Sequence, residues 1–177
     1  KCQITVSTSF FVPKPFTPFQ WASMFMPGDY LGFAKTVNHE IKSMLNQKSI
    51  RYMWHEADVT VLEGFLARGD RRTAKVILEA YRLGALFDAW TECWDYEKWL
   101  KAFENTGMDM HFYTMRQRAD DEIFPWDFID IGVTKKFLLR EWKRAREEQV
   151  TTPNCRMKCS GCGAGRYKGG VCIESKN

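Results

Sequence analysis

The residues with the clearest chemical potential are cysteines that lie close together near the end of the chain. Cys155, Cys159 and Cys162, three of the six cysteines, fall within eight residues at C-x3-C-x2-C spacing, and Gly163 follows the last of them. Thiolates spaced this closely can surround a tetrahedral zinc ion or bind an iron–sulfur cluster. The spacing does not separate these two metals. The sequence therefore predicts a thiolate metal site in this segment.

A fourth ligand is needed to complete such a site. Cys172 follows Cys162 by ten residues, across the glycine-rich run 163–170, and is the candidate for this role. A disulfide framework is the alternative. The chain shows no secretory leader, and Cys2 and Cys93 stand alone in core-like sequence, which favours metal over disulfides.

Composition describes a globular chain of mildly basic character. Its 177 residues are 45% hydrophobic and 15% aromatic, enough to bury a core, and the formal net charge is +4. That excess tolerates nucleic acid as a partner, but a solvated surface is the favoured explanation. No apolar run approaches the roughly 18 residues of a membrane span, and no signal-peptide pattern opens the chain. We therefore expect a cytoplasmic protein without a membrane partner.

The first half of the sequence predicts a βαβ unit. Apolar residues alternate in Ile4 to Phe11 and again in Ile50 to Trp54, as they do in half-buried strands. Asp29 caps a predicted helix between them, with Phe33, Val37, Ile41 and Leu45 along its buried stripe. The two strands should be parallel neighbours because a helix of this length suits a crossover connection.

The rest of the chain is predicted to be mainly helical, from about residue 58 to 148. Thr60 and Glu63 have the spacing of a capping box for a helix that ends at Gly69, and Asp95 caps a later helix. Thr134 opens an amphipathic helix, and the residues along one side of it are Phe137, Leu138, Glu141, Trp142 and Ala145. The opposite faces of that helix are basic and carry Lys135, Lys136, Arg140, Lys143, Arg144 and Arg146.

Two further features could serve a substrate. The segment Val12 to Trp21 places three prolines among aromatic residues, which fixes the backbone directly after a strand, where α/β proteins often hold ligands. A stiff lid over a hydrophobic core is the alternative. His55 beside Glu56, at the end of the second strand, suits proton transfer or substrate contact. His39 and His111 are expected to be surface or core residues.

Several motifs, taken in order, resemble those of one family. They are residues 6–21 (VSTSFFVPKPFTPFQW), 67–72 (ARGDRR), 87–90 (FDAW), 125–127 (PWD), 137–141 (FLLRE) and the tail from Thr152 to Cys162. The family comprises the radical S-adenosylmethionine proteins fused to an N-terminal cobalamin-binding-type domain. The resemblance covers nearly the whole chain and implies the C-terminal third of such a protein.

This resemblance implies an α/β to α+β fold. Residues 1–57 would form the C-terminal edge of a partial (β/α) radical S-adenosylmethionine barrel, 58–150 a helical domain, and 151–177 an irregular cysteine-rich tail. The catalytic 4Fe-4S cluster would lie before Lys1, so the catalytic residues are unknown and this chain alone should be inactive. The C-terminal cysteines would then hold an accessory iron–sulfur cluster or zinc.

The resemblance also implies the chemistry of the whole protein. Reductive cleavage of S-adenosylmethionine, driven by an electron donor such as ferredoxin or flavodoxin, would give a 5′-deoxyadenosyl radical that attacks an unknown substrate. Cobalamin is a further cofactor that the missing N-terminal domain would bring. Lys14, Gln20 and Trp21, at the mouth of the implied barrel, are candidates for substrate contact. Phe16 stands where the family often has histidine, which weakens a proton-transfer role there.

A second hypothesis needs no catalysis. The cysteine tail would be a zinc knuckle, and the basic helix from Lys135 to Arg146 would bind RNA.

Overall fold

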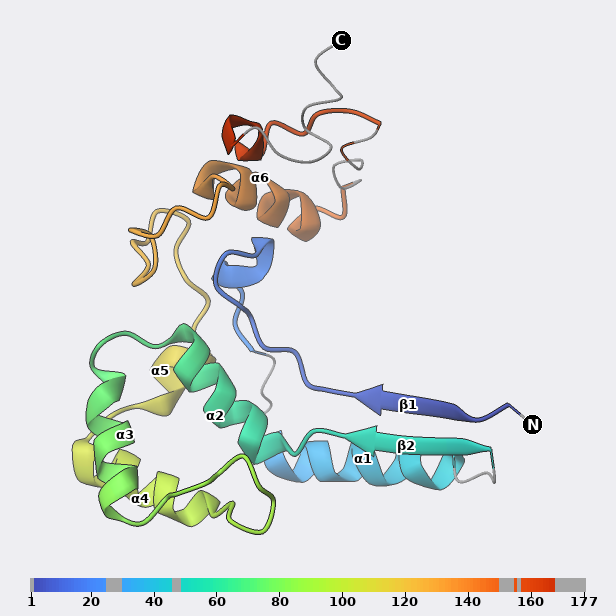
Figure 1. Ribbon diagram of the computed structural model, residues 1–177, viewed down its shortest axis with the longest axis vertical. Helices are drawn as coiled ribbons and strands as arrows, with labels where there is room; N and C mark the ends of the chain where they lie inside the picture. The colour runs from blue at the N-terminus through green and yellow to red at the C-terminus, as the bar shows by residue number, and fades with distance from the viewer. Residues whose placement is uncertain (1, 25–29, 46–48, 150–154, 156, 168–177) are drawn as a thin grey trace. The chain divides into compact units, whose positions relative to one another are not determined.

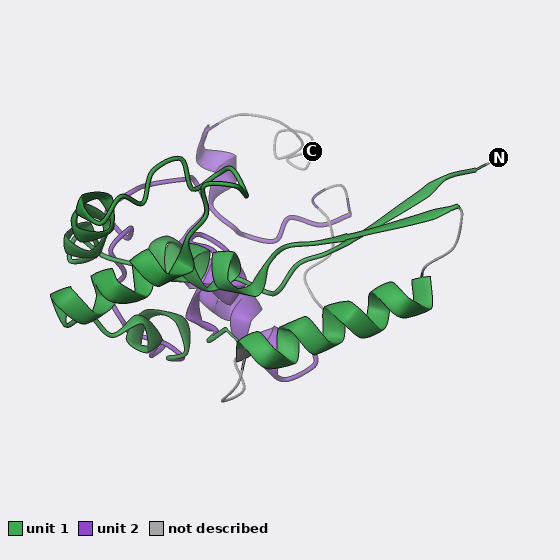
Figure 2. Cartoon of the chain, turned by 90° about the horizontal axis from the view of Figure 1, so that it is seen from below, with its two compact units in different colours: residues 1–12, 23–116 green, residues 13–22, 117–177 purple. Residues whose placement is uncertain are grey.

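The computed structural model describes residues 2–24, 30–45, 49–149, 155 and 157–167. The described part is a mixed α/β structure with six α-helices and one two-stranded parallel sheet (Figure 1). Its residues group into two compact units, one of residues 1–12 and 23–116 and the other of residues 13–22 and 117–177 (Figure 2). We call them unit 1 and unit 2. The three domains predicted at 1–57, 58–150 and 151–177 divide the chain differently and stay predictions.

Unit 1 begins with the predicted βαβ arrangement. Strand β1 (Ile4–Thr8) pairs in parallel with β2 (Ile50–Trp54), in a register that runs from Ile4 opposite Ile50 to Thr8 opposite Trp54. Helix α1 (Tyr30–Leu45) connects them and packs on β2. The parallel pairing is confirmed, and β2 has the bounds expected from the sequence. Strand β1 ends at Thr8, short of Phe11, and no barrel is formed by the described residues, in which only these two strands pair.

The buried face of α1 differs from the predicted one. Phe33, the first residue of the expected apolar stripe, is 48% exposed, whereas Ala34 is fully buried and Asn38 is 6% exposed. Ala34 packs against Ala57 and Val61 of the next helix, α2 (Ala57–Arg68). Small side chains let the two helices approach closely, and the Asn38 amide oxygen accepts a hydrogen bond from the Tyr52 hydroxyl at 3.2 Å. Contacts with β2 and α2 therefore determine which face of α1 is buried. The number of large apolar residues on a face does not.

The main core of unit 1 lies among four helices, α2, α3 (Thr73–Arg82), α4 (Tyr96–Thr106) and α5 (Met110–Thr114). Phe65 of α2 is fully buried at its centre. Its ring meets the edges of Phe103 and Tyr113, with centroids 4.7 and 5.2 Å away. Such edge-to-face pairs stabilise a core beyond the area they bury. The other buried members are Leu62, Val76, Ala80, Trp99 and Ala102.

The helix ends test the predicted caps. Asp95 caps α4 as expected, since its carboxylate accepts a hydrogen bond from the Glu97 backbone N–H at 3.1 Å. Gly69 ends α2, also as expected. The capping box at Thr60 is wrong, because α2 begins three residues earlier, at Ala57, and Thr60 lies inside the helix. Its hydroxyl donates to the Glu56 carbonyl at 2.9 Å, a bond available to threonine within a helix.

Unit 2 joins the proline-rich segment to the C-terminal helix. The short 3-10 helix η1 (Pro18–Trp21) packs on α6 (Lys135–Arg146), and a mostly irregular segment of residues 117–134 precedes α6. Trp21, Phe124, Trp126, Leu138 and Trp142 form the core. Thr134 caps α6 as predicted, accepting a hydrogen bond from the Phe137 backbone N–H at 3.2 Å. A second 3-10 helix, η2 (Ala164–Tyr167), lies in the cysteine-rich tail.

None of the helices in the described part of the chain combines the length and apolar character needed to cross a membrane.

Candidate functional site

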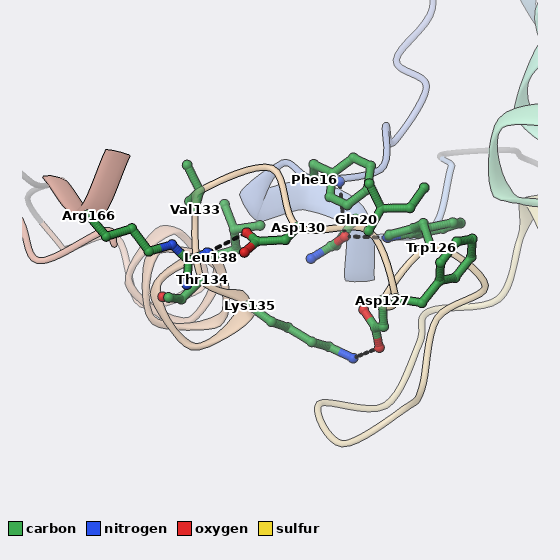
Figure 3. Close-up of a pocket in the computed structure, with 12 residues that line it drawn as sticks. Phe16, Gln20, Trp126, Asp127, Asp130, Val133, Thr134, Lys135, Leu138 and Arg166 are labelled. Carbon is green, nitrogen blue, oxygen red and sulfur yellow. Dashed lines mark hydrogen bonds and ion pairs between the residues drawn. The ribbon is translucent and has the colours of Figure 1, made fainter. Parts of the chain in front are cut away.

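A pocket of about 300 Å³ lies within unit 2, between η1 and the segment that leads into α6 (Figure 3). Its lining combines apolar and aromatic side chains with charged and polar groups. The lining residues are Phe16, Gln20, Trp126, Asp127, Phe128, Ile129, Asp130, Val133, Thr134, Lys135, Leu138 and Arg166.

Gln20 is the buried polar residue of this pocket, with only 3% of its surface exposed. Its Oε1 atom accepts two hydrogen bonds, from the Trp126 indole N–H at 2.8 Å and from the Phe16 backbone N–H at 3.1 Å. Both partners are donors, so they fix which end of the amide is oxygen. The amide nitrogen therefore occupies the other end, away from Trp126 (Figure 3).

Two ion pairs supply the charges of the pocket. The Lys135 ammonium pairs with Asp127 and also donates to the Glu122 carbonyl at 2.6 Å. The Arg166 guanidinium pairs with Asp130. Each cation thus has a carboxylate beside it, and the two pairs together carry no net charge.

Asp130 connects the pocket to the cysteine-rich tail. Its carboxylate accepts hydrogen bonds from the Gly132 backbone N–H and from the Tyr167 hydroxyl, both at 2.8 Å. The bond from Gly132 is the main cause that lowers the pKa of Asp130, and the bond to Asp130 raises the pKa of Tyr167. At neutral pH Asp130 is therefore ionised and Tyr167 is protonated, which are the states that the hydrogen bond between them requires.

The predicted substrate residues do not gather in one place. Gln20 lines the pocket, while Trp21 is fully buried in the core, where its ring centroid lies 5.3 Å from that of Phe124. Lys14 is exposed and outside the pocket lining. His55 is an exposed residue of unit 1, and its backbone N–H donates to the Thr8 carbonyl at 3.2 Å. Substrate contact by Lys14, Trp21 and His55 stays a prediction.

Sequence reasoning did not single out Trp126, Asp127, Asp130 or Arg166 as site residues. The signal that could have found the first two was the Pro-Trp-Asp motif at 125–127, in which an indole donor and a carboxylate stand side by side. No local pattern indicated Asp130 or Arg166, because their pairing joins positions 36 residues apart.

The described cysteines of the tail lie on a segment that is held against α6. The backbone N–H of Thr134, the helix cap, donates to the Cys162 carbonyl at 2.8 Å, and the Arg140 guanidinium donates to the Ser160 carbonyl at 2.6 Å. Cys155 and Cys162 are half-buried and Cys159 is exposed. The tail thus has a defined attachment on both sides of Gly161.

The backbone around Cys162 is shaped for close approach to its sulfur. Gly161 and Gly163 adopt positive φ angles of 67° and 106°, and the Ala164 backbone N–H donates to Cys162 Sγ at 3.5 Å. Within the described residues, no three histidine, cysteine or acidic side chains come together as a metal-binding group. Cys172, the predicted fourth ligand, lies outside the described residues. The four-cysteine metal site stays a prediction.

Comparison with protein-family models, curated protein sequences and solved structures found no match to this chain.

Proposed function

We propose that the cysteine-rich tail is a thiolate metal centre attached to α6. The observation that carries the proposal is the hydrogen bond from the Ala164 backbone N–H to Cys162 Sγ at 3.5 Å, between glycines at positive φ. Hydrogen bonds from N–H groups to cysteine sulfur are a regular feature of thiolate metal centres. Cys159 is exposed and three residues away, so it is accessible to the same ion. Cys155 and Cys172 complete the proposed ligand set.

We further propose that this centre is the accessory iron–sulfur or zinc site of a radical S-adenosylmethionine enzyme. The parallel β1-α1-β2 arrangement supports this proposal, because such units build (β/α) barrels. The whole enzyme would act in the cytoplasm, use S-adenosylmethionine and a 4Fe-4S cluster, and take electrons from a ferredoxin or flavodoxin. Cobalamin would enter through the family's N-terminal domain. Gln20, in the pocket of unit 2, is the candidate substrate contact that the geometry favours.

Metal analysis of matched cysteine variants tests the centre. The protein purified without oxygen should contain either iron and sulfide, with absorption near 400 nm, or stoichiometric zinc without colour. Cys159→Ser should lose that metal, because a thiolate ligand is removed. Cys93→Ser is the control, since Cys93 belongs to unit 1 and stands apart from the other cysteines in sequence. Full metal content in Cys159→Ser would reject the proposed centre.

Cleavage of S-adenosylmethionine tests whether the catalytic cluster lies outside this chain. The resemblance assigns the catalytic cluster to a region outside this chain, so the isolated chain, reconstituted with iron, sulfide and a reductant, should release no 5′-deoxyadenosine. Release above that of a protein-free reaction would contradict this expectation and would assign the catalytic cluster to Cys155, Cys159 and Cys162.

The basic face of α6 favours RNA binding as the second candidate function. Lys136, Arg140, Lys143 and Arg144 line one shallow groove. However, Lys143 pairs with Asp120 at 3.0 Å and Arg144 with Glu141 at 3.2 Å, which reduces the charge available for phosphates. This candidate would be favoured if the protein is colourless, contains zinc and binds single-stranded RNA. The affinity for RNA should fall steeply as the salt concentration rises, and it should be lower in Lys136→Ala than in the unaltered protein.

A further inference from the structure

The pocket of unit 2 contains a hydrogen-bond donor that the fold leaves unused. The Gln20 Oε1 atom is committed to Trp126 and Phe16, and no hydrogen bond joins Gln20 Nε2 to any residue in the described part of the chain. The nitrogen points into the pocket, away from the Trp126 indole (Figure 3). Nε2 is not one of the fully buried atoms that lack a partner, so solvent reaches it through the pocket in the free protein. A ligand oxygen placed here would replace that solvent with a hydrogen bond inside the pocket.

The apolar side chains of the pocket indicate the body of such a ligand. They belong to Phe16, Trp126, Val133 and Leu138, of which Trp126 and Leu138 are buried core residues. A volume of about 300 Å³ is at the lower end of small-molecule pockets. A compact ligand with an aromatic ring suits both the size and the lining.

The charges of the pocket indicate that the ligand is uncharged. Lys135 is already paired with Asp127, and Arg166 with Asp130. A carboxylate ligand would lie near the Asp127 and Asp130 carboxylates, which repel it and compete with it for Lys135 and Arg166. A neutral carbonyl group can accept from Gln20 Nε2 without disturbing either pair.

We propose that this pocket binds a small uncharged ring compound whose carbonyl oxygen, in a carboxamide or lactam group, accepts a hydrogen bond from Gln20 Nε2. If this ligand is the substrate of the enzyme, that identification rests on the proposed function; binding of the ligand does not. Binding itself needs no metal, so protein stripped of metal with a chelator should bind as well as untreated protein. Loss of the metal proposal would therefore leave the binding result intact, and the reverse also holds.

Benzamide and benzoate are matched probes, because they share a ring and differ in charge. In a two-dimensional ¹⁵N NMR titration, benzamide should shift the Trp126 indole N–H signal and should bind at least about tenfold more tightly than benzoate. Tenfold corresponds to about 1.4 kcal/mol, within the range for one net hydrogen bond.

Gln20→Glu removes the donor and keeps the acceptor. A glutamate oxygen can still accept from Trp126 and Phe16, while the second oxygen replaces Nε2, so benzamide affinity should fall about tenfold or more. Gln117→Glu makes the same chemical change at an exposed position outside the pocket lining and should leave affinity unchanged. Val133→Phe, which fills the pocket without altering Gln20, should also abolish binding.

Near-ultraviolet circular dichroism shows whether each variant is folded. If Gln20→Glu does not fold, the proposal stands or falls on Val133→Phe and on the preference for benzamide over benzoate in the unaltered protein. No saturable benzamide binding, benzoate bound as tightly as benzamide, or unchanged affinity in a folded Gln20→Glu or Val133→Phe would each overturn it.

Discussion

The Arg68 side chain donates a hydrogen bond from Nε to the Tyr113 backbone carbonyl at 2.5 Å and another from Nη2 to the Arg116 carbonyl at 2.7 Å. Arg68 is 1% exposed, so these bonds lie inside unit 1 and join the end of α2 to the end of α5. A helix this short leaves its last carbonyls without partners inside the helix. The buried guanidinium supplies the missing donors.

Arg68→Met should therefore destabilise unit 1 strongly. The methionine fills a similar space but leaves two buried carbonyls without these donors, at about 1–3 kcal/mol each. Urea denaturation followed by circular dichroism measures the change in the free energy of unfolding. Arg82→Met is the control, since the Arg82 side chain is 65% exposed, and it should cost less than about 0.5 kcal/mol. Equal losses in the two variants would contradict the role of Arg68.

Local patterns predicted much of the fold. Strand β2 was found from the alternation of Ile50, Tyr52 and Trp54, and the starts of α4 and α6 from Asp95 and Thr134, because these signals act within a few residues. The buried side of α1 was not found. Ala34 and Asn38 are buried in place of Phe33 because Ala34 packs on α2 and Asn38 bonds to Tyr52, and the periodicity of α1 contains neither partner.

Asp70 gives a prediction for low pH. Its carboxylate accepts hydrogen bonds from the Arg72 guanidinium and backbone N–H, and the guanidinium bond is the main cause that lowers the pKa of Asp70 to about 2. A lowered pKa stabilises the folded state fully above the ordinary value of about 3.9. This stabilisation should disappear as the pH falls from about 4 to about 2.

A carboxyl-carbon NMR titration measures the pKa of Asp70 directly. In Arg72→Ala it should rise toward its ordinary value, because the largest cause of the shift is removed, and the stability of the variant should depend less on pH between about 4 and 2. The same low pKa in Arg72→Ala would show that the guanidinium is not responsible.

The candidate site was predicted less completely than the fold. Gln20 was expected to contact substrate, yet its partner Trp126 is 106 residues away, and the sequence offers no rule that pairs them. The cysteines were recognisable because their spacing is local. The attachment of their segment to α6 was not, since Thr134 and Arg140 contact backbone carbonyls, which every residue has.

Gly163 should be essential for attachment of the tail to α6. Its φ is 106°, and a Cβ atom here would lie 2.8 Å from Thr134 Cγ2 and 3.1 Å from the Gly132 carbonyl oxygen. Gly163→Ala therefore adds a clash to the cost of the left-handed conformation, which is about 1–2 kcal/mol. The Thr134 amide, which donates to the Cys162 carbonyl, reports the attachment through its rate of hydrogen exchange.

Gly161→Ala is the matched control for this variant. Its φ is 67°, and a Cβ atom would have nothing within 4 Å, so it adds backbone strain without a clash. We expect the Thr134 amide to exchange at least about tenfold faster in Gly163→Ala than in Gly161→Ala, equivalent to about 1.4 kcal/mol. Equal exchange rates would mean that the contact with Thr134 does not hold the tail.

The Tyr52 hydroxyl joins the three elements of the βαβ unit. It lies 2.6 Å from the Thr8 hydroxyl of β1 and donates to the Asn38 amide oxygen of α1 at 3.2 Å, while Tyr52 itself belongs to β2. Tyr52→Phe keeps the ring and its stacking on Trp54, with centroids 5.3 Å apart, and removes only the hydroxyl. The free energy of unfolding of unit 1 should fall by about 0.5–1.5 kcal/mol for each hydrogen bond broken.

Tyr81→Phe is the control for this loss. Tyr81 is exposed on α3, and no hydrogen bond of its hydroxyl is found among the described residues, so its removal should change stability by less than about 0.5 kcal/mol. Hydrogen exchange separates local from global effects, because the amides of β1 and β2 should lose protection in Tyr52→Phe while those of α3 and α4 keep it. Unchanged protection of the strands would show that the hydroxyl does not hold β1, α1 and β2 together.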